Sequence, residues 1–77
     1  MFELSKLRND IDKIDKYIID LLRYRKKIVI EISKIKKRNN IDVEDKNREI
    51  KVLSKAKDEY EKEILKKVII ESRKLQL

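Results

Sequence analysis

The first half of the chain carries an aliphatic residue at every third or fourth position, the spacing that gathers side chains on one face of an α-helix. One position in this row holds an arginine instead. The row consists of Leu4, Leu7, Ile11, Ile14, Ile18, Leu21, Arg25, Ile28, Ile32 and Ile35. A guanidinium in the centre of an apolar face costs several kcal/mol unless an anion meets it there. The pattern therefore predicts a long helix over about residues 4–37, with an anion-binding position near its middle.

Two shorter helices are predicted in the second half of the chain. The segment 38–42, rich in Asn and Asp, favours a break because these residues tolerate helix-ending conformations and cap new helices. Apolar residues then return at helical spacing over about 43–57 and again over about 60–76, with a turn at the polar stretch between them. We expect residues 1–77 to form a single all-α domain of three helices.

The predicted first helix is too long to cover its own apolar row. It would measure about 50 Å at 1.5 Å per residue, and it cannot fold back on itself. A chain of 77 residues also buries only a modest part of its surface when it folds alone. The simplest way to cover the row is a second copy of the chain, so we expect an intertwined homodimer.

Composition excludes several kinds of chemistry. The chain has no Cys and no His, so it offers no disulfide, thiolate nucleophile, imidazole base or ordinary zinc site. It also has no Gly, which removes the phosphate-cradling loops of nucleotide-binding folds. We expect no cofactor and no metal, and neither ATP nor NAD dependence.

The charge balance points to an anionic partner. Lys and Arg number 22 against 15 Asp and Glu, which leaves a net charge of +7, and either a nucleic acid or a small polyanion would fit it. The chain has no apolar run of the length that a membrane span or a signal peptide requires. We therefore expect a cytoplasmic protein without a membrane partner.

Two further cations lie at informative distances from Arg25 along the predicted helix. Lys36 follows Arg25 by about three full turns, so the two lie on nearly the same face, about 16 Å apart along the axis. Arg8 precedes Arg25 by about 25 Å of helix, too far to share one small ligand within the same chain. In an antiparallel dimer, however, the N-terminal end of one long helix approaches the middle of the other. Arg8 could then contribute from the partner.

The shorter helices also bring polar groups to a core-facing edge, at Asp45, Arg48 and Glu49 in one and at Ser72 and Gln76 in the other. Taken singly, each of these residues could also have a purely structural role. The cation in the apolar row could snorkel to water, and the other two could be surface charges. Asp45 could serve only as a helix N-cap, and Arg48 with Glu49 could form a solvated pair. The two groups near the C-terminus could belong to a fraying end.

The joint pattern resembles the all-helical chorismate mutase family, whose members are intertwined dimers with one long helix and two shorter ones. The resemblance rests on the segments LRNDIDKIDKYIIDLLRYRKKIVIEISKIKK, VEDKNREI and IIESRKLQ. The matching positions of the family's site are Arg8, Arg25, Lys36, Asp45, Arg48, Glu49, Ser72 and Gln76. Between the second and third segments the chain is shorter than the better-known bacterial members. We expect a short, stand-alone member of the family without a regulatory or dehydratase domain.

The resemblance implies the Claisen rearrangement of chorismate to prephenate, a step of phenylalanine and tyrosine biosynthesis. Arg25 and the partner's Arg8 would bind the two carboxylates of the substrate, which guanidinium forks match. Lys36 and Gln76 would donate to the ether oxygen, whose negative charge grows in the transition state. Glu49 would accept from the ring hydroxyl. The three remaining positions would orient the substrate and these main ligands.

The competing interpretation is a basic helical coiled coil or a nucleic-acid-binding module. The net charge and the heptad-like row support it. Against it, acidic residues are interspersed throughout, only four aromatic residues could stack on bases, and no concentrated basic recognition helix is present. This interpretation also leaves the arginine in the apolar row unexplained. We therefore expect an enzyme with no nucleic-acid partner.

Overall fold

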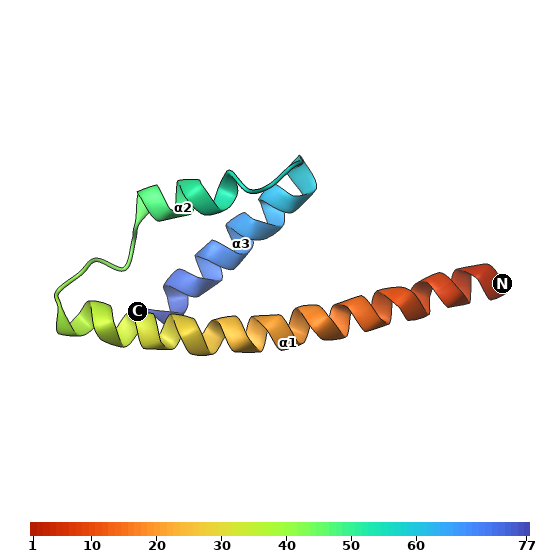
Figure 1. Cartoon of the computed structure of the whole chain (residues 1–77), viewed down its shortest axis with the longest axis horizontal. Coiled ribbons are helices and arrows are strands. Elements are labelled where there is room, and N and C mark those ends of the chain that lie inside the picture. The colour runs from red at the N-terminus through yellow and green to blue at the C-terminus, as the bar shows by residue number, and fades with distance from the viewer.

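Three α-helices and no strand make up the chain, as predicted, and the computed structural model describes all of residues 1–77. They are α1 (Phe2–Arg38), α2 (Lys46–Leu53) and α3 (Glu59–Leu75). Figure 1 shows α3 running back to the C-terminal half of α1 and α2 lying beside α3, while the N-terminal half of α1 extends alone. The second half of the chain therefore packs as a body on one end of a long arm.

The long helix ends at the predicted break by a defined capping motif. Asn39 is the C-cap, and Asn40 has a φ of 54°, the only positive φ in the chain. The next backbone N–H, that of Ile41, donates to the carbonyl of Lys36 at 2.9 Å. This is a Schellman closure, and Asn takes the left-handed position that Gly usually fills. The chain is thereby turned toward α2 without a glycine.

The second helix is shorter than the predicted range 43–57, because capping interactions close it at both ends. Asp45 forms its N-cap by accepting from the backbone N–H of Arg48 at 3.0 Å. At the other end, the hydroxyl of Ser54 donates to the carbonyl of Lys51 at 2.7 Å, and the next two backbone N–H groups pair three residues back. No Gly or Pro marks this end in the sequence. The third helix, expected over 60–76, begins at Glu59 after the N-cap Asp58.

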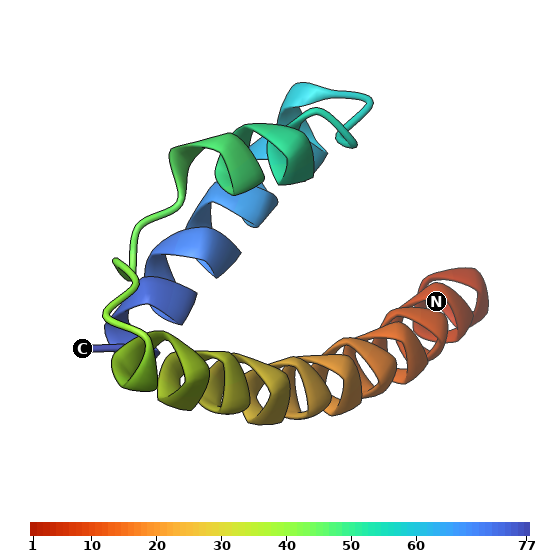
Figure 2. The same cartoon turned by 60° about the vertical axis from the view of Figure 1, so that its left-hand side comes forward.

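The core is small and lies where α1 and α3 cross. Only four residues are buried, the apolar Val29 and Ile69 and the polar Ser33 and Gln76. The radius of gyration is 16.1 Å, against about 11–12 Å for a compact chain of this length. Figure 2 shows the reason, since the N-terminal half of α1 reaches away from both other helices.

The apolar row of that N-terminal half is exposed. Leu7, Ile11 and Ile14 are between 50% and 61% exposed. None of the three helices combines the length and the apolar character that a bilayer span requires. The row therefore has the spacing of a buried helix face, but nothing in the chain covers it.

Candidate active site

Seven of the eight predicted site positions line one cleft, of about 360 Å³, between the three helices. Each helix contributes to it, and apolar side chains complete its walls. The polar residues are Arg25 and Lys36 from α1, Asp45, Arg48 and Glu49 from the start of α2, and Ser72, Arg73 and Gln76 from α3. The fold thus collects residues that lie as much as 51 positions apart in the chain.

Arg25 is half-buried and directed toward α3. Its Nη1 donates to the hydroxyl oxygen of Ser72, and that hydroxyl in turn donates to the carbonyl of Val68 at 2.6 Å. The guanidinium therefore has a partner across the helix interface, which does not fit the snorkelling interpretation. A guanidinium has five N–H donors, so most of them stay available for a ligand. Ser72 orients the arginine and does not compete with an anion for it.

Lys36 and Gln76 face each other at one end of the cleft. The Nζ of Lys36 donates to the carbonyl of Val43 at 2.8 Å and to the Oε1 of Gln76 at 3.1 Å. The amide Nε2 of Gln76 donates to the carbonyl of Ser72 at 3.2 Å. An ammonium has three donors and a side-chain amide has two, so one N–H of each group is left without a partner. Two donors are thus preorganised side by side.

The position of Gln76 does not fit the fraying-end interpretation. Although it is the last residue but one, it is only 8% exposed. Both polar atoms of its amide are engaged, one by Lys36 and one by the backbone of α3. The C-terminus is therefore fixed as part of the cleft wall.

A hydrogen bond between the Asp45 side chain and the Arg48 backbone links these two residues at the start of α2. The Asp45 carboxylate caps the helix by accepting from the Arg48 N–H, which agrees with the structural interpretation of this acid. Both side chains are exposed and line the cleft. The cap fixes where α2 begins, and so it sets the position of Glu49 one residue beyond Arg48.

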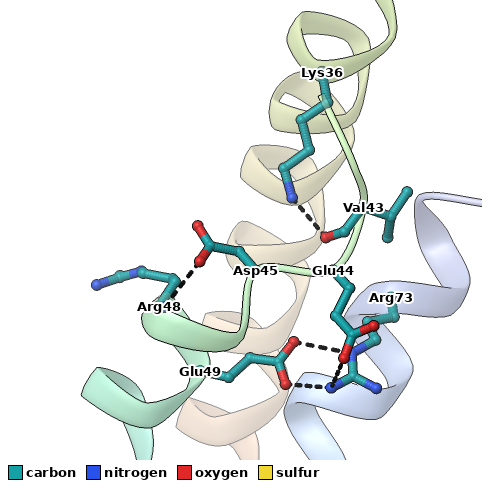
Figure 3. A network of polar contacts seen from close by, with 7 residues as sticks. All are labelled: Lys36, Val43, Glu44, Asp45, Arg48, Glu49 and Arg73. Atoms are coloured by element: carbon teal, nitrogen blue, oxygen red, sulfur yellow. Dashed lines mark hydrogen bonds and ion pairs between the residues drawn. The ribbon is translucent and has the colours of Figure 1, made fainter. Parts of the chain in front are cut away.

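Glu49 is paired with Arg73, not with Arg48, so the expected alternative of a solvated local pair is wrong. The Arg73 Nε donates to Glu49 Oε2 at 3.0 Å, and its Nη2 donates to Oε1. Glu44 lies 4.0 Å from the same Nη2 (Figure 3). These contacts, first among them the hydrogen bonds to Glu49, raise the pKa of Arg73 above its ordinary value. Sequence reasoning missed Arg73, because no local spacing links it to a residue 24 positions earlier.

The cleft carries a positive balance. Its cations are Arg25, Lys36, Arg48 and Arg73, and its carboxylates are those of Asp45 and Glu49. Four positive groups against two negative ones suit a ligand with two negative charges. Arg8, the eighth predicted position, lies on the exposed N-terminal half of α1 and lines no part of the cleft.

The profile of the family described as chorismate mutase type II matches residues 7–77. The chain belongs to the chorismate mutase family. It is 36% identical over 59 residues to the T-protein of Enterobacter agglomerans, covering 77% of this chain and 16% of that protein. It is 42% identical over 53 residues to the bifunctional chorismate mutase/prephenate dehydratase of Buchnera aphidicola, covering 69% of this chain and 14% of that protein. The chain thus spans less than a fifth of either relative.

The fold is found again in a solved structure of a relative. A conserved hypothetical protein from Pyrococcus furiosus superimposes with a TM-score of 0.93 at 42% identity, over 100% of this chain and 99% of that one. Membership of the chorismate mutase family indicates an enzyme, and the arginine of the apolar row, Arg25, lines the cleft. The interpretation as a basic coiled coil or nucleic-acid-binding module leaves that arginine unexplained, so it is not favoured.

Proposed function

We propose that this protein catalyses the rearrangement of chorismate to prephenate in the cleft between its three helices. The observation that carries the proposal is the Lys36–Gln76 pair, with one free N–H on each group, in the same cleft as Arg25. The reaction requires no nucleophile and no proton transfer. A chain without His, Cys or cofactor can therefore perform it by holding a reactive conformer and stabilising developing charge.

Lys36 and Gln76 supply the part of the stabilisation that increases along the reaction. As the ether C–O bond breaks, negative charge grows on the ether oxygen, and two donors aimed at that oxygen bind the transition state more strongly than the substrate. Their positions are fixed in advance, Lys36 by Val43 and Gln76 by the backbone of α3. Little reorganisation is then needed when the charge develops.

The remaining polar residues hold the substrate in its bent form. Arg25, oriented by Ser72, binds one carboxylate through its free N–H groups. Glu49 keeps unused lone pairs on both oxygens and accepts the ring hydroxyl. Asp45 and Arg48 line the same wall and complete the orientation.

The second carboxylate is bound by the partner's Arg8 in an intertwined homodimer. Support comes from the surface, since this chain of 9.4 kDa exposes 7077 Å², whereas a compact monomer of that mass exposes about 5,000 Å². The excess of about 2,000 Å² per chain is in the range of obligate dimers. The exposed large apolar residues include Leu7, Ile11 and Ile14 of the apolar row of α1.

A second groove supports this arrangement of the partner. It measures about 440 Å³ and lies between α1 and α3. Five apolar side chains line it, together with Arg25, Lys26, Lys67, Glu71 and Ser72. An apolar row of a partner's α1 laid against it would bring the partner's Arg8 toward Arg25. The dimer thus explains both the uncovered row and the absence of Arg8 from the cleft. The cytoplasm is the compartment that such a biosynthetic step implies.

The test is an assay of chorismate disappearance on the purified protein and on Lys36→Ala. We expect wild-type turnover, and a kcat about 10²- to 10³-fold lower in the variant with little change in KM, because the lost donor acts mainly in the transition state. Lys37→Ala is the matched control, since Lys37 is exposed and lies outside the cleft. A wild-type protein that leaves chorismate unchanged, or a Lys36→Ala protein with full kcat, would contradict the proposal.

A further inference from the structure

Arg73 lines the cleft, but it is not one of the eight site positions predicted from the sequence. It stands directly after Ser72 and three residues before Gln76, so it shares the last turns of α3 with two site residues. Its guanidinium engages both carboxylate oxygens of Glu49, through Nε at 3.0 Å and through Nη2. This fork arrangement fixes the orientation of a carboxylate as well as its position.

Arg73 is also the only polar side-chain link between α2 and α3. The second helix has eight residues and none of them is buried, so few apolar contacts hold it in place. The segment that leads into α2 is held by the same guanidinium, through Glu44 at 4.0 Å. Figure 3 shows Glu44 and Glu49 converging on Arg73 from two directions. Any displacement of α2 that carried Glu49 out of the cleft would have to break this pairing.

The Arg73–Glu49 pair also reduces electrostatic repulsion in the cleft. An unpaired carboxylate at Glu49 would repel a substrate that itself carries carboxylates. With Arg73 beside it, the pair is neutral overall, yet the carboxylate keeps its capacity as an acceptor. An ionised carboxylate has about four lone-pair sites, of which Arg73 occupies two. The side chain of Glu49 is 20% exposed, so this compensation acts in a partly desolvated setting.

We propose that Arg73 is a positioning residue for Glu49, which fixes its carboxylate at the cleft wall and cancels its charge toward the anionic substrate. The free lone pairs of Glu49 then accept the substrate hydroxyl. The role rests on the proposed function. Arg73 acts through Glu49 and makes no contact of its own with the reacting atoms.

The experiment is a double-substitution cycle on chorismate turnover with Arg73→Gln and Glu49→Gln. In the wild-type background Arg73→Gln lowers kcat/KM about 10- to 100-fold, mainly by raising KM, because repulsion and a misplaced acceptor weaken binding of substrate and transition state alike. In the Glu49→Gln background no carboxylate is left to hold or neutralise. The same substitution then changes kcat/KM by less than about threefold. Arg73→Lys, which keeps the charge but not the fork, gives an intermediate loss.

Lys74→Gln is the matched control, because it removes the same charge from the next residue, where Lys74 is exposed and pairs only with Glu71. It leaves turnover unchanged. Thermal melting of every variant separates loss of stability from loss of positioning. An equal loss in both backgrounds, or no loss in either, would overturn the role of Arg73 while the wild type remains active. A wild type without turnover would overturn the proposed function, and this role with it, so the two failures are distinct.

Discussion

The two halves of α1 obey the same hydrophobic pattern but meet different surroundings. In the C-terminal half, α3 packs on the face next to the row, where Val29 and Ser33 are only 7% and 6% exposed, while Ile28 of the row itself is 44% exposed. In the N-terminal half, Ile11 and Ile14 are 55% and 50% exposed, and nothing in the chain covers them. Periodicity therefore shows that a helix face is built to be covered. It does not show whether the cover comes from the same chain or from another.

The same difference separates the site residues. Arg25 and Lys36 lie in the covered half and already have partners in the cleft. Arg8 lies in the uncovered half and has none there. On our account the two halves serve one site, because the N-terminal half of one chain completes the cleft of the other. Substitutions that act on one half at a time test this division.

The largest effect is expected from a charge placed in the uncovered row. Ile14→Glu leaves an isolated chain almost undisturbed, because the side chain is half exposed there. In a dimer it buries an unpaired charge twice, at about 3–5 kcal/mol for each. We expect sedimentation to show loss of the dimer and chorismate turnover to fall at least about a hundredfold.

The matched control for this substitution is Lys16→Glu, two residues away and outside the row. It should keep the dimer and the activity. An Ile14→Glu protein that sediments as the wild type does, with unchanged turnover, would show that the N-terminal half is not an interface.

A smaller and more selective effect is expected from the two helix caps of the covered half. Asp45 and Asp58 cap α2 and α3 in the same way, accepting from backbone N–H groups at 3.0 and 2.8 Å. Replacing either with Ala should cost about 1 kcal/mol, and lower the Tm by about 4–8 °C. Only Asp45 lines the cleft.

Asp45→Ala should therefore lose activity as well as stability, whereas Asp58→Ala should lose stability alone. The measurement is a thermal melt paired with kcat/KM at a temperature where both variants are folded. Equal activities in the two variants would reduce Asp45 to a cap, which is the structural interpretation that the sequence left open.

Much of the fold could be predicted from the sequence because its signals are local. The row from Leu4 to Ile35 marks a single helix, and the break after Arg38 falls where asparagines can take a left-handed turn. The end of α2 could not be predicted, since Ser54 and ordinary backbone turns close it without Gly or Pro. The end of α2 depends on how α3 packs beside it, and a short stretch of sequence does not contain that information.

The residues of the candidate site also differ in whether the sequence could predict them. Arg25 stood out by breaking an apolar row, and the other seven positions followed from their spacing and the family resemblance. Arg73 gave no such signal, because its exposed neighbours Lys74 and Glu71 make it look like one more surface charge. Its pairing with Glu49 depends on the packing of α2 against α3. Residues that act across helices are thus the ones that sequence alone leaves out.

The central claim, that each cleft is completed by a second chain, is tested most directly by mixing two inactive variants. Arg8→Ala and Arg25→Ala each remove one half of the carboxylate clamp. When they are refolded together in equal amounts, half of the dimers are mixed, and each mixed dimer holds one intact site. We expect about a quarter of wild-type activity to return. If the mixture shows no more activity than the two variants refolded separately, the shared site is contradicted.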